Sequence, residues 1–177
     1  FSYGFIYVKG QLLTAKDSGI KGFDDLRDKN VVTTAGTTNE RFIKSYSADH
    51  KMGMNVISAK DHGEAFKMLE TGRAVAFYMD DALLYGERAK ARDPHKWVVV
   101  GDEQSREIYS CMVRKDDPQL LAVVNQALAD LYKSGEITGI YQRWFEQPIP
   151  PNGLNLEFPM TAELKQIIAK PVSDPVE

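Results

Sequence analysis

The sequence predicts an α/β fold: one complete lobe with a mostly parallel sheet flanked by helices, joined to a part with a different pattern. Short apolar runs alternate with helical patterns between residues 12 and 105. Such alternation favours right-handed crossovers and parallel strands. From residue 106 onward, one strand pattern is followed by helical patterns alone. The 177 residues are 43% hydrophobic and 27% charged, which is ordinary for one globular domain or two small lobes.

The first part opens with two apolar runs, at residues 5–8 and 12–14, which read as two strands or as one bent strand. Further apolar runs predict strands at residues 31–34, 55–58, 74–79 and 97–100. Helical spacing of apolar residues predicts helices at residues 23–27, 38–46, 62–70 and 81–91. Each of the last three helices therefore closely follows a strand.

The second part is expected to begin with a strand at residues 107–113. Two aspartates and a proline at residues 116–118 predict a helix start, because carboxylates stabilise the positive end of a helix and proline fits its first turn. This helix should end at Gly135. Its apolar residues recur at helical spacing and predict a buried stripe of Leu120, Leu121, Val124, Leu128 and Leu131. Further helices are expected at residues 137–145 and 162–169, with a proline-rich connector between them.

Charge and hydropathy exclude several classes of partner. The net charge of -3 and the pI near 5.7 give no basic field, so neither nucleic acid nor an anionic membrane surface is a predicted partner. No apolar run approaches the roughly 20 residues that span a bilayer. The first ten residues lack a basic segment followed by a cleavable apolar stretch, so we expect a mature or trimmed chain.

Motifs for catalysis, cofactors and metals are missing from the sequence. The three histidines have no HExxH or CxxC context, and there is no GxSxG, GxGxxG or GxxxxGK[ST] pattern. We therefore expect no cofactor, no metal site and no enzyme activity, although Asp80 and Asp81 form the kind of pair that can act as an acid/base dyad. Cys111, the single cysteine, is a buried small hydrophobe, a free thiol, or half of a disulfide with an absent partner.

Polar residues follow three of the expected strands. Thr37 and Thr38 open the helix after residues 31–34, and free N–H groups at a helix start suit a carboxylate or a phosphate. Asp80 comes directly after the strand at residues 74–79, where a carboxylate can meet a cationic group. His62 opens the helix that follows the strand at residues 55–58. The alternative is that the threonines and one aspartate only cap helices and that the histidine is merely solvated. Convergence of three strand ends on one rim favours a ligand site.

Ordered sequence matches along nearly the whole chain carry a family resemblance. The matching segments are AGTTNE at residues 35–40, ISAKDHGEAF at 57–66, GRAVAFYMDDALL at 72–84, CMVRKDDPQ at 111–119, SGEI at 134–137 and EQPIPPNGLN at 146–155. With these segments the chain resembles the periplasmic glutamate/aspartate-binding proteins of ABC importers. The resemblance implies a type II periplasmic-binding fold, whose two lobes close over the ligand by hinge motion.

The resemblance also implies roles for the strand-end residues. Thr37 and Thr38 would cradle the ligand's α-carboxylate, and Asp80 would pair with its α-ammonium group. His62 would contact the side-chain carboxylate of L-glutamate or L-aspartate, with its charged form favouring the ligand. The expected partner is the ABC permease in the membrane, and the expected location is the periplasm.

Family members carry a further N-terminal stretch, so the resemblance implies that lobe two, residues 12–105, is complete and that lobe one, residues 1–11 and 106–177, is incomplete. Uncovered apolar surface on lobe one would favour self-association, unless another segment covers it. Cys111 would then have lost a disulfide partner, in keeping with an oxidising periplasm. The rival functions are a dehydratase-like periplasmic enzyme and the ligand-sensing domain of a receptor or regulator on the same scaffold.

Overall fold

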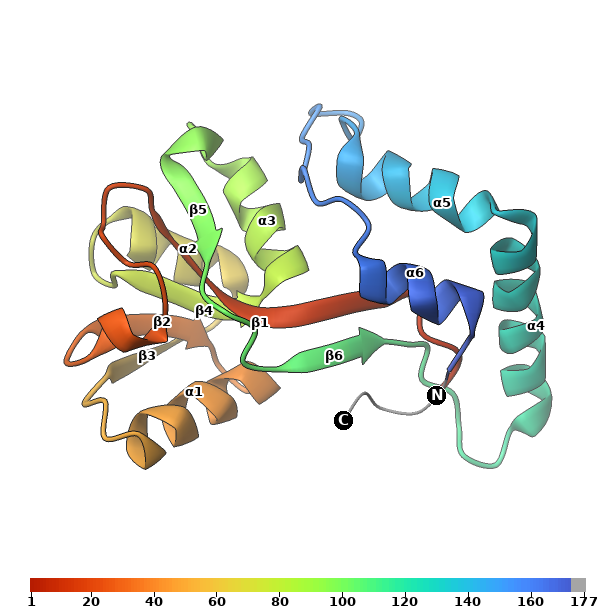
Figure 1. Cartoon of the computed structure of the whole chain (residues 1–177), viewed down its shortest axis with the longest axis horizontal. Coiled ribbons are helices and arrows are strands. Elements are labelled where there is room, and N and C mark those ends of the chain that lie inside the picture. Colours follow the sequence, from red (N-terminus) through yellow and green to blue (C-terminus); the bar gives the residue numbers. More distant parts are fainter. Residues whose placement is uncertain (173–177) are drawn as a thin grey trace. The chain divides into compact units, whose positions relative to one another are not determined.

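The computed structural model describes residues 1–172, which form two compact units (Figure 1). One unit comprises Lys9–Ser105, and the other comprises Phe1–Val8 with the chain from Arg106 onward. Strand β1 (Ile6–Ala15) is a single strand that passes from one unit into the other after Val8. Of the two predicted arrangements for residues 5–14, the one continuous strand is therefore correct.

The Lys9–Ser105 unit is built on a sheet of five strands in the order β3-β2-β4-β1-β5. Besides β1, these strands are β2 (Asn30–Thr34), β3 (Asn55–Ala59), β4 (Ala76–Asp80) and β5 (Trp97–Val100). Strand β2 pairs in parallel with both β3 and β4, whereas β1 pairs antiparallel with both β4 and β5. Four strands thus run in one direction. Strand β1 lies between β4 and β5 and runs in the opposite direction to both.

Helices cover both faces of this sheet. They are η1 (Phe23–Leu26), α1 (Thr38–Asp49), α2 (His62–Glu70), α3 (Asp81–Lys90) and η2 (Pro94–Lys96). Consecutive strand residues point to opposite faces, so Leu13, Val32 and Phe77 pack with α2 and α3. Their neighbours in sequence, Leu12, Val31 and Tyr78, pack with η1 and α1 on the other face. Burial on both faces explains why these strands read as continuous apolar runs.

The other unit contains one strand of its own and mainly helices. The strand is β6 (Arg106–Tyr109), which pairs with β1. The helices are α4 (Pro118–Ser134), α5 (Glu136–Tyr141), the π-helical turn η3 (Gln142–Glu146) and α6 (Ala162–Ala169). The strand is shorter than predicted. The helix predicted at residues 137–145 is α-helical only to Tyr141, and Gly135, with φ of 78°, separates it from α4.

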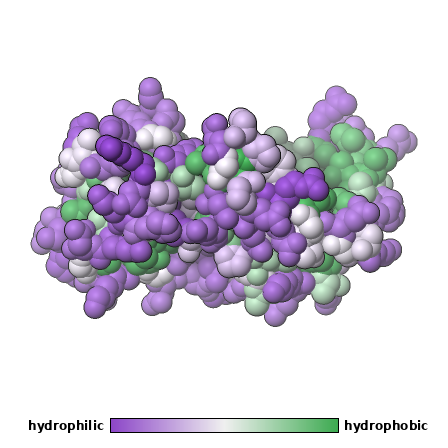
Figure 2. Space-filling view, turned by 90° about the horizontal axis from the view of Figure 1, so that it is seen from above, coloured by the Kyte–Doolittle hydropathy of each residue, from purple (hydrophilic) through white to green (hydrophobic). Residues whose placement is uncertain are grey.

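The predicted buried stripe on α4 is wrong. None of its five residues is buried, Leu120 is 46% exposed, and the one buried residue of α4 is Tyr132, whose hydroxyl donates to the main-chain oxygen of Gly4. Within residues 1–172, the large hydrophobic side chains that are exposed all belong to this unit: Phe1, Met112, Leu120, Val123, Ile140 and Trp144. Figure 2 shows hydrophobic surface at the α4 end of the unit. Leu121, Val124, Leu128 and Leu131 are half-buried, so this side of α4 is only partly covered.

Two further expectations concern single features. Cys111 is exposed with a free thiol, so the interpretation as a buried hydrophobe is wrong for this residue. None of the helices formed by residues 1–172 has the length and apolarity to cross a membrane.

Candidate functional site

The carboxyl ends of β2, β3 and β4 share one edge of the sheet, because these strands are parallel. Strand β2 lies between the other two, and its last residue, Thr34, pairs with Ala59 at the end of β3. Helices α1, α2 and α3 begin just beyond the three strand ends. Polar groups at this edge are therefore directed to one rim, where ligands of open α/β sheets bind.

Thr37 is the N-cap of α1. Its hydroxyl accepts a hydrogen bond from Glu40 N (3.0 Å) and donates one to the main-chain oxygen of Thr34 (2.7 Å). The capping interpretation is therefore correct for this hydroxyl, whose only proton is already donated to Thr34 and is not left for a ligand carboxylate. Thr38 is the first residue of α1 and its side chain is exposed.

The Glu40 carboxylate stabilises the loop that precedes α1 by hydrogen bonding. Its carboxylate accepts hydrogen bonds from the ammonium group of Lys44 (2.7 Å), from the Ser58 hydroxyl and from Gly36 N (2.7 Å). These donors, of which Lys44 has the largest effect, lower the pKa of Glu40 to about 2. Gly36 has a φ of 77°, a backbone conformation that glycine adopts at little cost. The loop is thus held from β3 and from α1 at once.

Asp80 ends β4 and is only 5% exposed. Its Oδ1 accepts a hydrogen bond from Asn39 Nδ2, in the first turn of α1, over 3.0 Å. Although Asp80 occupies the N-cap position of α3, its side chain makes no capping bond there. The capping interpretation is therefore wrong for this carboxylate, which faces α1 instead.

Asp81, the first residue of α3, accepts main-chain hydrogen bonds at the start of this helix, which Asp80 does not. Its Oδ1 accepts hydrogen bonds from Ala82 N (2.8 Å) and from Lys9 N in β1 (3.1 Å). Burial raises the pKa of Asp81 to about 6, and these two bonds act in the opposite direction. The carboxylate therefore anchors the start of α3 to β1 rather than pairing with Asp80 as a dyad.

His62 is the first residue of α2 and is half-buried. Its Nδ1 lies 2.7 Å from Thr34 Oγ1, at the end of β2. The N-cap of α2 is Asp61, which accepts a bond from Glu64 N (2.8 Å). His62 is therefore neither a cap nor a purely solvated side chain, since β2 holds one of its ring nitrogens.

The rim thus brings together all four predicted residues, Thr37, Thr38, His62 and Asp80. Sequence reasoning missed their supports, Thr34, Asn39 and Glu40. Glu40 carried a recognisable signal, because a glutamate three residues after a threonine cap is typical of a helix start. The bonds of Thr34 and Asn39 join residues 28 and 41 positions apart, and no local pattern marks them.

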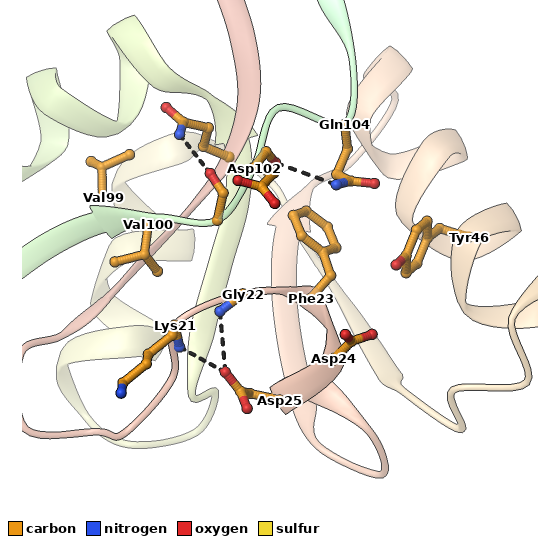
Figure 3. Close-up of a pocket in the computed structure, with 12 residues that line it drawn as sticks. Lys21, Gly22, Phe23, Asp24, Asp25, Tyr46, Val99, Val100, Asp102 and Gln104 are labelled. Carbon is orange, nitrogen blue, oxygen red and sulfur yellow. Dashed lines mark hydrogen bonds between the residues drawn. The ribbon is translucent and has the colours of Figure 1, made fainter.

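A separate cavity of about 730 Å³ lies in the same unit, beside η1 (Figure 3). Aromatic rings and carboxylates line it: Phe23, Tyr46, Asp24, Asp25 and Asp102. The Asp25 carboxylate accepts hydrogen bonds from the N–H groups of residues 21 and 22, at 2.8 and 3.1 Å. None of the four predicted site residues lines this cavity. Within residues 1–172, no group of His, Cys, Asp and Glu side chains is arranged to hold a metal ion.

An α/β unit with helices on both faces and polar groups at the carboxyl ends of its parallel strands has the architecture of a lobe of the type II periplasmic-binding class. The chain belongs to the bacterial extracellular solute-binding proteins, family 3, whose sequence profile matches residues 1–147.

Named relatives agree with this assignment. The chain is 62% identical over 177 residues to an L-glutamate/L-aspartate-binding protein of Pseudomonas aeruginosa, and the match covers all of the chain and 59% of that protein. It is 48% identical over 171 residues to a glutamate/aspartate import solute-binding protein of Escherichia coli K12, covering 97% of the chain and 57% of that protein. The chain therefore spans less than two thirds of the length of these relatives.

Solved structures show the same fold. An ancestral arginine-binding protein bound to arginine superimposes with a TM-score of 0.71 at 31% identity. The match covers 82% of this chain and 63% of that one. The type II periplasmic-binding fold predicted from the sequence is therefore confirmed.

Proposed function

We propose that this chain is part of the solute-binding component of an ABC importer, which captures L-glutamate or L-aspartate in the periplasm and delivers it to the membrane permease. The Lys9–Ser105 unit would be lobe two, and the remaining residues would contribute to lobe one. Support comes from the two relatives of 62% and 48% identity, whose names give these ligands.

The observation that carries the proposal is the order of the groups along the rim. Strands β3 and β4 flank β2, so His62 and Asp80 stand on either side of the loop that holds Thr37 and Thr38. Strands in a sheet are about 4.8 Å apart, which puts the two outer strand ends roughly 10 Å from each other. An acidic amino acid carries its ammonium group and α-carboxylate on one carbon and a second carboxylate at the end of its side chain, so hydrogen bonds of about 3 Å at both ends would let it bridge this distance.

Each group suits one of these charges. The buried Asp80 carboxylate suits the ammonium group, because a charge-assisted pair is strongest away from water. The start of α1 suits the α-carboxylate through its main-chain N–H groups. The His62 imidazole suits the side-chain carboxylate. The rim supports binding rather than catalysis, since Asp80 and Asp81 are each engaged by separate donors. The dehydratase-like and sensory alternatives have no observation in their favour.

The test is calorimetric titration of the protein, at the full length of its natural chain, with L-glutamate, L-aspartate and L-glutamine. His62→Ala should weaken binding of the acidic ligands by roughly ten- to a hundredfold, the usual effect of losing a hydrogen bond to a charged group. His95→Ala is the matched control, because His95 is exposed on η2 and away from the rim. A preference for glutamine, or turnover of any of the three compounds, would refute the proposal.

A further inference from the structure

Thr34 and His62 face each other from neighbouring elements of the rim. Thr34 Oγ1 and His62 Nδ1 are 2.7 Å apart, within hydrogen-bond distance. Thr34 is only 6% exposed, and its main-chain oxygen is bound by the Thr37 hydroxyl. Its main chain is also paired with β3, the strand that leads into α2. The main chain that carries this hydroxyl is therefore held in place from several sides.

The His62 ring depends on this hydroxyl for its orientation. Among residues 1–172, Thr34 is the hydrogen-bond partner of the ring, and no carboxylate is bonded to it. The two acidic residues nearest in sequence are engaged elsewhere: Asp61 caps Glu64 N, and the Glu64 carboxylate accepts a bond from Lys60 N. The partner of the imidazole is thus a neutral group that can both donate and accept.

The kind of partner at Nδ1 determines whether Nε2 can carry the proton in a neutral ring. A carboxylate can only accept, so a carboxylate at Nδ1 would hold the proton there and leave a neutral ring with a lone pair at Nε2. A hydroxyl can instead donate to Nδ1, which leaves the proton on Nε2. It can also accept from Nδ1–H when the ring is charged, and Nε2 then again carries a proton.

We propose that Thr34 is a positioning residue that presents Nε2–H of His62 to the side-chain carboxylate of an acidic ligand. This inference rests on the proposed function. The ligand carboxylate can only accept, so it requires a donor at Nε2. The two ring nitrogens point in divergent directions, and with Nδ1 on Thr34 it is Nε2 that is left for the ligand. Thr34 supports that donor in both the neutral and the charged ring.

The test compares Thr34→Val, which removes the hydroxyl at nearly constant shape, with Thr34→Ser, which keeps it. Nitrogen-15 NMR of the ligand-free protein reports which nitrogen of His62 carries the proton. Thr34→Val should change the His62 ring signals and weaken L-glutamate binding by about tenfold, as expected for one hydrogen bond. Thr34→Ser should restore both within about twofold.

Thr33→Val is the matched control, because Thr33 lies beside Thr34 in β2 but its hydroxyl donates to the main-chain oxygen of Tyr78 in β4 (3.0 Å) and not to His62. It should lower stability without moving the His62 signals. Unchanged ring signals and affinity in Thr34→Val would overturn the inference. So would a neutral wild-type ring with its proton on Nδ1, whether or not the variant folds. If the wild type binds no acidic amino acid, the proposed function fails, while the ligand-free spectra still test the contact.

Discussion

Asn39 Nδ2 donates a hydrogen bond of 3.0 Å to Asp80 Oδ1, and the two residues are only 2% and 5% exposed. Asn39 belongs to the first turn of α1 and Asp80 ends β4, so the bond ties the helix after β2 to the neighbouring strand. Asn39 Oδ1 has no hydrogen-bond partner within residues 1–172. A buried polar side chain with an unused acceptor is costly to keep, and here it orients a buried carboxylate.

Replacing Asn39 should therefore reduce stability. Asn39→Leu removes the Nδ2 donor and leaves the buried Asp80 carboxylate less well satisfied, which should lower the free energy of unfolding by about 1–3 kcal/mol. Urea denaturation measures the change. Asn55→Leu is the control, since its side-chain bond to Asn30 is exposed, and it should stay within about 0.5 kcal/mol of wild type. Equal losses in the two variants would contradict a special role for the buried pair.

Asp81 makes stability depend on pH in the direction opposite to most carboxylates. Its pKa is raised by burial from the ordinary 3.8 to about 6, so the folded state disfavours the charged form. The stability that this group contributes is present below about pH 3.8 and is lost as pH rises through 6. Asp81→Asn keeps an oxygen for the N–H groups of Lys9 and Ala82 and removes the charge.

Asp81→Asn should therefore stabilise the protein above pH 6, by roughly 2–3 kcal/mol on the size of the shift. The gain should shrink as pH falls and disappear near pH 4. Urea midpoints measured at pH 8, 6 and 4 give the comparison. A variant that is less stable than wild type at pH 8 would show that the ionised carboxylate stabilises the fold.

Glu40 should show the ordinary carboxylate dependence. Its pKa is lowered to about 2 from 4.5, chiefly by the hydrogen bond from Lys44, so its stabilising effect is present above pH 4.5 and is lost as pH falls towards 2. Glu40→Gln should be less stable than wild type at pH 7 and should approach it near pH 2. Glu70→Gln, which removes a long 3.6 Å ion pair with Lys67, is the control and should show little of this trend. NMR titration of the Glu40 carboxyl carbon checks the cause, and a midpoint near 4.5 would contradict it.

Local sequence signals predict most element positions in the Lys9–Ser105 unit. The helix at residues 62–70 and the strand at residues 97–100 coincide with α2 and β5, because a capping aspartate precedes the first and an apolar run defines the second. The insertion of β1 between β4 and β5 was not predictable, because alternation of strands and helices gives connections and not strand order. Helical periodicity likewise identified the apolar side of α4 without saying what covers it.

In the candidate site, likewise, the positions of the residues could be predicted from the sequence and their contacts could not. The rim residues could be found because each follows a strand that runs in the common direction, as with His62 after β3. Their contacts could not, because the Thr34–His62 and Asn39–Asp80 bonds depend on strand register and side-chain rotamers. A pattern of residue types therefore predicts which residues lie at this edge of the sheet, whereas the orientation of their side chains requires coordinates.

The exposed apolar side of α4 predicts self-association of the 177-residue chain. Leu120 is 46% exposed and Val123 is 66% exposed, and they lie three residues apart on one helix. Contiguous apolar surface promotes association because its burial releases hydration water. Sedimentation velocity at increasing concentration should therefore show species larger than 19.9 kDa.

A double substitution, Leu120→Lys with Val123→Lys, should shift the chain towards monomer, because two like charges would have to be desolvated in the contact. Ser45→Lys with Ala48→Lys is the matched control: it adds the same charge at the same spacing on an exposed part of α1 in the other unit. A shift in both variants would attribute the effect to net charge. A shift in the α4 variant alone would locate the contact on this helix, and a monomeric wild type at high concentration would refute the prediction.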